Sequence, residues 1–121
     1  MHEAASDYCE LIDELIQETG EARAVDLAKL LGISQVSVGK TVQRLARDGF
    51  VTALPYRSIF LTETGTALAA KSRERHELVL GLLQKLGVPE EAAHLDAEGI
   101  EHHVSDTTLA AIRKFLESGG R

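Results

Sequence analysis

The sequence has few of the residues that typify secreted or membrane-spanning chains. Among its 121 residues are one cysteine, two prolines and no tryptophan. One cysteine excludes an internal disulfide, which fits a reducing cytoplasm. No apolar run approaches the roughly 18–20 residues that a membrane-spanning helix needs, and the N-terminal MHEAASDYCEL lacks the basic and apolar regions of a signal peptide. We therefore expect a cytoplasmic protein of one compact domain, or of two small ones that share a core.

Charge is unevenly distributed along the chain, whose net charge is −6. Residues 1–20 and 89–106 contain acidic side chains but no lysine or arginine. Residues 32–61 are locally basic, with one acidic residue, Asp48, against Lys40, Arg44, Arg47 and Arg57. The basic segment can contact phosphates. The acidic segments call for a different partner, and a divalent cation is one candidate.

Apolar residues recur at helical spacing through most of the chain, which predicts a mainly α-helical fold with a small β-wing. The expected helices cover residues 6–19, 22–31, 34–49, 63–86, 89–103 and 106–117. Ser6 is expected to cap the first helix, and Pro89 to occupy the first helical position of the fifth. In the second helix, Leu27, Leu30 and Leu31 are expected to face the core.

Residues 22–49 have the pattern of a helix-turn-helix, because a short helix is followed by Gly32 and then by a helix that begins at Ser34. Residues 50–61 then contain two short β-like runs, which predicts a wing. The second helix of such a motif enters the major groove of DNA. Glutamine pairs with adenine, serine with several base edges, and basic side chains suit phosphates. The side chains expected at the DNA are Ser34, Gln35, Ser37, Lys40, Thr41, Arg44, Tyr56 and Arg57.

A second set of side chains has the chemistry of a metal site. Asp7 and Glu10 lie three residues apart, so a helix places both carboxylates on one face. The plainer interpretation of this pair alone is a solvated helix surface. Cys9 lies about 200° around the helix from Asp7 and is interpreted as a small core residue. A further group at spacing i, i+3, i+4 consists of Glu98, Glu101 and His102, and His76 lies alone on the long helix.

If these three helices pack together, four carboxylates and two imidazoles converge. Burying like charges without compensation is very costly, and two divalent cations would balance four carboxylates. Oxygen-rich sites with some imidazole suit manganese or ferrous iron better than copper. The sequence therefore predicts a binuclear site.

The motifs DYCELI, EARAVDLAKLLGISQVSVGKTVQRLARDGFV, PYRSIFLTETG, RERHELV and DAEGIEHHVS together resemble the manganese transport regulator (MntR) branch of the diphtheria toxin repressor (DtxR) family. The resemblance covers nearly the whole chain and implies a binuclear manganese site. The ligands that it implies are Asp7, Glu10, His76, Glu98, Glu101 and His102. Iron-responding relatives place methionine and cysteine where this chain has Asp7 and Glu98, which favours manganese.

The resemblance implies a manganese-dependent repressor of metal-uptake genes, with two Mn(II) ions per subunit, that binds operator DNA as a homodimer without an organic cofactor. We expect residues 1–71 to form a winged helix-turn-helix domain and residues 72–121 a helical domain for metal binding and dimerisation. Three alternatives stay open: an iron or zinc sensor, a winged-helix adaptor without metal, and a helical di-metal enzyme. The enzyme is disfavoured because such bundles use repeated Glu-x-x-His motifs, which this sequence lacks.

Overall fold

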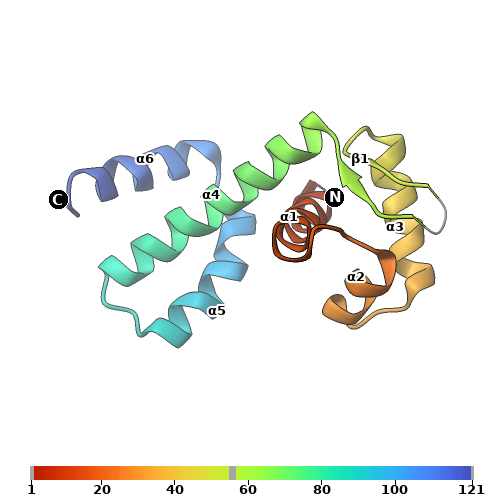
Figure 1. The fold of residues 1–121 in the computed structure, drawn as a ribbon. Coiled ribbons are helices and arrows are strands. Elements are labelled where there is room, and N and C mark those ends of the chain that lie inside the picture. Colours follow the sequence, from red (N-terminus) through yellow and green to blue (C-terminus); the bar gives the residue numbers. More distant parts are fainter. Residues whose placement is uncertain (1, 55–56, 121) are drawn as a thin grey trace. The chain divides into compact units, whose positions relative to one another are not determined.

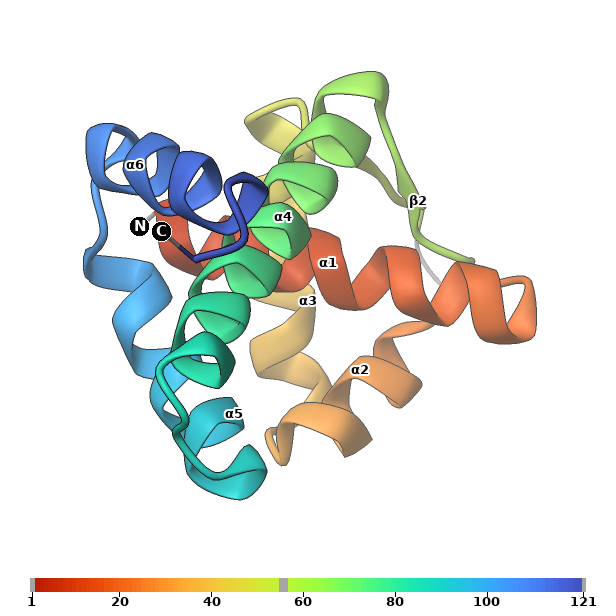
Figure 2. The ribbon, with the colours of Figure 1, turned by 90° about the vertical axis from the view of Figure 1, so that its left-hand side faces the viewer.

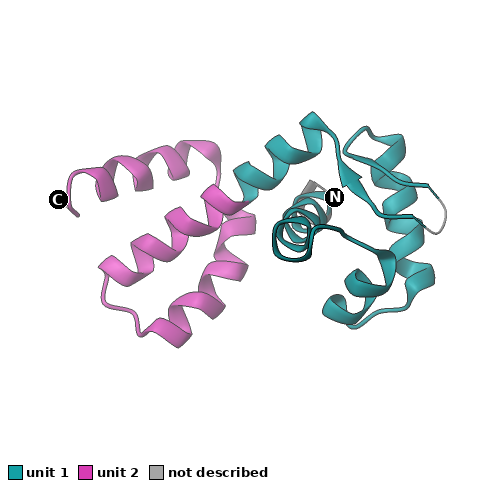
Figure 3. Cartoon of the chain, viewed as in Figure 1, with its two compact units in different colours: residues 1–72 teal, residues 73–121 magenta. Residues whose placement is uncertain are grey.

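The computed structural model describes residues 2–54 and 57–120 (Figure 1). The chain divides into two compact units, unit 1 with residues 1–72 and unit 2 with residues 73–121 (Figure 3). Within the described residues no helix is both long and apolar enough to cross a membrane.

Unit 1 is a three-helix motif followed by a small antiparallel sheet. Its elements are α1 (His2–Thr19), α2 (Ala24–Leu31), α3 (Gln35–Arg47), β1 (Val51–Thr52), β2 (Phe60–Leu61) and the first part of α4 (Glu63–Lys85). Val51 pairs with Leu61, and Thr52 with Phe60. A separate antiparallel bridge joins Ala22 to Ile59, so the strand pair is also tied to the segment that leads into α2. The predicted helix-turn-helix and wing are confirmed.

The turn between α2 and α3 follows from two residues. Gly32 ends α2 with φ 67°, a left-handed conformation that glycine adopts without steric cost. Ser34 then caps α3, because its hydroxyl oxygen accepts a hydrogen bond from the Ser37 amide at 3.1 Å. The short, sharply reversed connection places the first turn of α3 at the surface.

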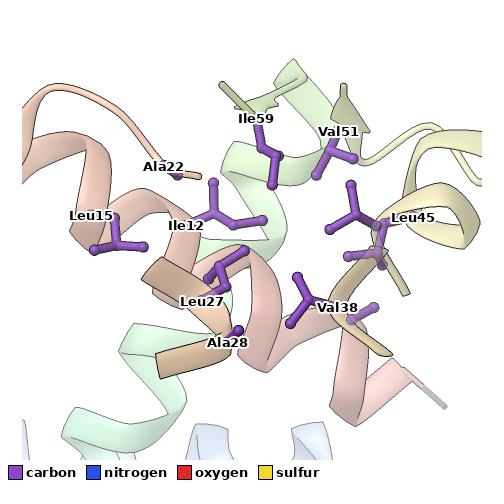
Figure 4. Packing of buried hydrophobic residues seen from close by; sticks show 11 residues of the cluster. Ile12, Leu15, Ala22, Leu27, Ala28, Val38, Leu45, Val51 and Ile59 are labelled. Atoms are coloured by element: carbon purple, nitrogen blue, oxygen red, sulfur yellow. The ribbon is translucent and has the colours of Figure 1, made fainter. Parts of the chain in front are cut away.

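The core of unit 1 joins α1, α2, α3 and the wing (Figure 4). Ile12, Leu27 and Val38 are fully buried and come from three different helices. Each contributes about 1.5–3 kcal/mol through removal of its side chain from water. This packing joins α3 and the wing through one shared core.

Gly65 in the first turn of α4 permits a close approach of backbone to backbone. A Cβ at this position would clash with the carbonyl oxygen of Phe50 and would also press on Leu61. Because the obstacle is backbone rather than a flexible side chain, only glycine fits here without a shift of the chain. Gly65 thus fixes where α4 leaves the wing.

Unit 2 packs the remainder of α4 between α5 (Glu90–Ile100) and α6 (Asp106–Glu117), as Figure 2 shows. Its small core joins Val79, Ala97 and Leu109, one from each helix. A single 3-10 turn, η1 (Glu101–His103), connects α5 to the segment before α6. The hydroxyl of Ser105 caps α6 by accepting from the Thr108 amide at 3.2 Å.

Several local predictions were wrong. Helix α1 begins at His2, so Ser6 lies inside it and is buried instead of capping it. Pro89 is the residue before α5, not its first helical residue. Leu30 and Leu31 are exposed, because α2 is only eight residues long and its last turn extends past the core that Leu27 and Ala28 contact. Helix α5 ends at Ile100, three residues earlier than expected.

Candidate metal centre and nucleic-acid interface

The first two turns of α3 present a polar surface to solvent. Ser34, Gln35 and Ser37 are exposed, as are Lys40 and Arg44 farther along the helix. Thr41 is half-buried on the side nearer the core. The Ser34 hydroxyl is already engaged as the helix cap and lies 3.1 Å from the Ser37 hydroxyl. Its main contribution to this surface is therefore the shape of the first turn.

Val36 belongs to the same surface and was missed by the sequence analysis. Its side chain is 69% exposed, whereas Val38, Val42 and Leu45 mark the buried face of α3. At 100° per residue Val36 lies about 160° away from Val38. An apolar residue opposite the core stripe was the available signal, because aliphatic groups contact the methyl group of thymine.

The wing contributes one described residue of the predicted interface. Arg57 is exposed at the tip of the wing. Tyr56, the other predicted wing residue, lies outside the described residues. In the described part of the chain, the basic side chains of the interface are therefore those of Lys40, Arg44 and Arg57.

In unit 1 the predicted metal ligands are on α1. Asp7 is exposed and Glu10 is half-buried. The Ser72 hydroxyl, itself buried, donates a hydrogen bond to Glu10 Oε1 at 2.9 Å. This bond fixes one oxygen of the carboxylate. Ser72 was missed because it is 62 residues from Glu10 in sequence and no local pattern connects the two.

In unit 2 a buried carboxylate contacts an imidazole from the long helix. Glu101 is 7% exposed, and its Oε2 lies 2.7 Å from His76 Nδ1. His102 Nε2 lies 3.9 Å from the other oxygen, Oε1. Burial of a carboxylate costs free energy unless the group has hydrogen-bonding or charged partners. His76 and His102 are such partners and reduce the cost of burying Glu101.

Glu98 is the fourth predicted ligand of unit 2. It is exposed in the last turn of α5, while Glu101 and His102 lie in η1. The predicted α-helix therefore ends at Ile100, and the group spans the end of α5 and a 3-10 turn; residues three apart lie on the same side in both kinds of helix. Within the described ranges, no three histidine, cysteine, aspartate or glutamate side chains are arranged to hold a metal ion. The structure thus brings together His76, Glu101 and His102, but not as a complete ligand shell.

The chemistry of these donors nevertheless fits a divalent cation. Carboxylate oxygens and imidazole nitrogens are ligands that Mn(II) and Fe(II) accept. A ligating imidazole typically has a carboxylate partner that fixes its ring orientation, and His76 already has such a partner. Unit 2 therefore contains side chains of the types that bind such ions.

Cys9 is excluded as a ligand by its position. It is fully buried in α1, and desolvation raises the pKa of its thiol from 9.0 to about 11. The thiolate, which is the form that binds metals, is therefore strongly disfavoured. The interpretation of Cys9 as a core residue is confirmed.

A second histidine–glutamate pair lies beside the first and was not predicted. His94 Nε2 is 3.0 Å from Glu90 Oε1, one turn away on α5. The rings of His94 and His76 have centroids 6.4 Å apart. Unlike Glu101, Glu90 is well exposed, so this pair is an exposed counterpart of the buried one.

Comparisons with known protein families also divide the chain into an N-terminal and a C-terminal part. A family model described as "Iron dependent repressor, N-terminal DNA binding domain" matches residues 1–59. A second, "Iron dependent repressor, metal binding and dimerisation domain", matches residues 62–119. Both halves of the chain are thus similar to parts of metal-dependent repressors.

Curated relatives match almost end to end. The chain is 52% identical over 118 residues to the transcriptional regulator MntR of Escherichia coli O6:H1, covering 98% of this chain and 76% of that protein. It is 42% identical over 111 residues to the HTH-type transcriptional regulator MntR of Bacillus subtilis (strain 168), covering 92% and 78%. These relatives are regulators, which confirms the expectation of a regulator over a di-metal enzyme.

Solved structures agree on the fold. A manganese-dependent transcriptional repressor in complex with manganese superposes with a TM-score of 0.79 at 29% identity. The manganese regulator SloR superposes with a TM-score of 0.79 at 26% identity. The matches cover 97% and 93% of this chain, which spans 53% of each solved chain.

Proposed function

The chain belongs to the iron dependent repressor family, and from that premise we propose that it is a manganese-activated, homodimeric repressor of metal-uptake genes. One observation carries the proposal: a buried carboxylate, Glu101, is paired with His76 within the segment similar to the metal binding and dimerisation domain. Manganese is favoured by the two MntR relatives and by the oxygen-rich donor set. A repressor acts where the DNA is, so we place it in the cytoplasm.

Two Mn(II) ions per subunit are proposed, held by Asp7, Glu10, His76, Glu98, Glu101 and His102. When bound, the ions supply positive charge that neutralises the four carboxylates of this set. Ser72 keeps Glu10 in position through its hydrogen bond, and Glu101 orients the His76 ring. We take residues 1–71 as the DNA-binding domain and residues 72–121 as the metal-binding and dimerisation domain.

The ligands belong to both units, and this suggests how metal binding would control DNA binding. Asp7 and Glu10 are on α1, which packs against α2 and α3 in the core of unit 1. The other four proposed ligands belong to unit 2. Ligands shared between the units would restrict the spacing of the two recognition helices of a dimer to about one DNA turn, roughly 34–36 Å. Metal binding would shift the population toward the state with restricted spacing. The free energy of this shift equals the difference in metal affinity between the restricted and the unrestricted states.

At the DNA, α3 is proposed as the recognition helix. Val36 joins the predicted set as an apolar contact to a thymine methyl. The predicted set is Ser34, Gln35, Ser37, Lys40, Thr41 and Arg44 of α3 with Tyr56 and Arg57 of the wing.

The decisive experiment selects a binding duplex from a random pool with the wild-type protein and Mn(II). Mobility shifts are then compared with Mn(II), with EDTA, and for Glu98→Ala and His102→Ala. We expect binding that EDTA abolishes and that both variants lose. Binding that is indifferent to EDTA would refute metal control, and tight metal-dependent binding by either variant would refute the ligand assignment.

An iron-responsive repressor is the second candidate, favoured by the description of both matching family models. The same mobility shift, titrated in parallel with Mn(II), Fe(II) and Zn(II), separates the candidates. Activation at the lowest concentration by Fe(II) would replace manganese with iron in the proposal and leave the architecture unchanged.

A further inference from the structure

A groove separates α3 from the wing in unit 1. Its volume is about 460 Å³, and its walls include Gln35, Gly39 and Gln43 of α3 together with Leu54 and Ile59 of the wing region. Arg23 and Arg57 also line it, and no carboxylate is among its described lining residues. The groove is therefore bordered by positive charge and has an otherwise neutral lining.

Arg23, at the start of α2, is held by a carboxylate that also holds the wing. Arg23 Nε lies 3.0 Å from Glu21 Oε1. The other oxygen, Glu21 Oε2, accepts a hydrogen bond from the Ser58 hydroxyl at 2.9 Å. The adjoining backbone bond, from Ile59 N to Ala22 O, is 2.7 Å long. Glu21 contacts Arg23 at Nε, the guanidinium nitrogen nearest the backbone, and the Arg23 side chain is 60% exposed.

We propose that this groove receives the sugar–phosphate backbone of one DNA strand, that Arg23 is a phosphate-binding residue, and that Glu21 is a positioning residue for it. The inference rests on the proposed function and adds Arg23 and Glu21 to the residues proposed at the DNA. When α3 lies in the major groove of DNA, one DNA strand at the edge of the major groove passes between α3 and the wing, along the groove of the protein. A phosphodiester chain is the anionic occupant that a groove flanked by two arginines complements.

Gly39 supports this occupant over an empty crevice. A Cβ built at Gly39 would have no heavy atom within 4 Å, so the glycine is not needed for packing within unit 1. Alanine would stabilise a helix at this position by about 1 kcal/mol relative to glycine. Because glycine has no side chain, the groove stays open at this position, where a DNA strand would pass.

The test uses the full chain with Mn(II) and two fluorescein-labelled duplexes, one of mixed sequence and one selected by the wild-type protein. Binding is measured by anisotropy as a function of salt. Arg23→Gln is expected to lower the slope of log K against log salt by about 0.9, the value for one phosphate contact, on both duplexes. Arg23→Lys keeps the charge and is expected to keep the slope. Lys114→Gln, an equal charge change at an exposed position of α6, is the matched control and is expected to leave the slope unchanged.

Glu21→Gln tests the positioning role. It should weaken binding to both duplexes at an unchanged melting temperature, because it loosens Arg23 without removing a cation. A melting temperature that falls in step with affinity would indicate a merely structural role and overturn this part of the proposal.

Gly39→Leu fills the groove from a position with open space around it. It is expected to keep or raise the melting temperature while it lowers affinity for both duplexes at least tenfold. Two results would overturn the groove assignment without affecting the proposed function. One is an affinity of Gly39→Leu equal to that of the wild type, and the other is a salt slope of Arg23→Gln equal to that of Lys114→Gln. Failure of the wild-type protein to bind either duplex with Mn(II) would instead overturn the proposed function.

Discussion

Replacement of Glu101 by glutamine separates the metal-binding role of this residue from its structural role. The side chain is 9% exposed and lies 2.7 Å from His76 Nδ1. Glutamine preserves its shape but removes its charge. A hydrogen bond to a charged group contributes about 1.5–3 kcal/mol, and a neutral one about 0.5–1.5 kcal/mol. We therefore expect the metal-free protein to lose about 1–2 kcal/mol at most, since relief of the buried charge opposes the loss.

In Glu101→Gln, the stabilisation that manganese adds is expected to change more than the stability of the metal-free protein. At a manganese concentration 100 times the wild-type Kd, binding stabilises the fold by about 2.7 kcal/mol. Removal of a ligating carboxylate should weaken manganese binding by about 100-fold or more, since even the outer partners of ligands contribute 10–100-fold. The same manganese concentration would then stabilise the variant by about 0.4 kcal/mol or less. The lost difference corresponds to roughly 10 °C in Tm for a chain of this size.

The assay is thermal melting with Mn(II) and with EDTA, for the wild type, Glu101→Gln and Glu90→Gln. Glu90 is the matched control, because it also contacts a histidine, His94, at 3.0 Å but is 70% exposed. Such an exposed pair contributes about 0.3–0.5 kcal/mol, and Glu90→Gln should keep the full manganese-induced shift. A full shift in Glu101→Gln, or an equal loss in both variants, would refute the reasoning.

Three further predictions follow from other contacts. Ser72→Ala removes the hydroxyl that donates to Glu10, and isothermal titration should show manganese affinity lower by about 10–100-fold; unchanged affinity would contradict a positioning role. Since burial raises the pKa of Cys9 to about 11, its contribution to stability is complete below pH 9 and is lost as pH rises to 11. Urea unfolding should show a loss of up to about 2.7 kcal/mol that is absent in Cys9→Ala. Gly65→Ala forces α4 away from the Phe50 carbonyl and should destabilise unit 1 by more than about 1 kcal/mol; a neutral result would show that the chain adjusts freely there.

The DNA-binding half could be predicted largely from sequence because its determinants are local. Gly32 reverses the chain and Ser34 caps α3 through bonds that span at most five residues. The two β-like runs within residues 50–61 likewise predicted β1 and β2. The outward position of Val36 was also available from helical geometry, because Val36 lies opposite the stripe formed by Val38, Val42 and Leu45.

The metal-binding half was predicted as a set of residue types, and its arrangement depended on packing. Spacing identified Glu98, Glu101 and His102 as a group, but it did not predict that α5 ends at Ile100 and that Glu101 and His102 lie in a 3-10 turn. The burial of Glu101 against His76 depends on how α4 and α5 pack, which spacing within one helix does not encode.

The sequence by itself determined which segments are helical, where α3 begins, and which donors are present, because backbone conformation and helical periodicity depend on near neighbours. Tertiary structure alone decided that Ser72 meets Glu10 across 62 residues, that Glu21 links Arg23 to the wing across 37, and that Leu30 and Leu31 lie outside the core. These outcomes depend on contacts between segments that are far apart along the chain, and such contacts exist only once the core has formed.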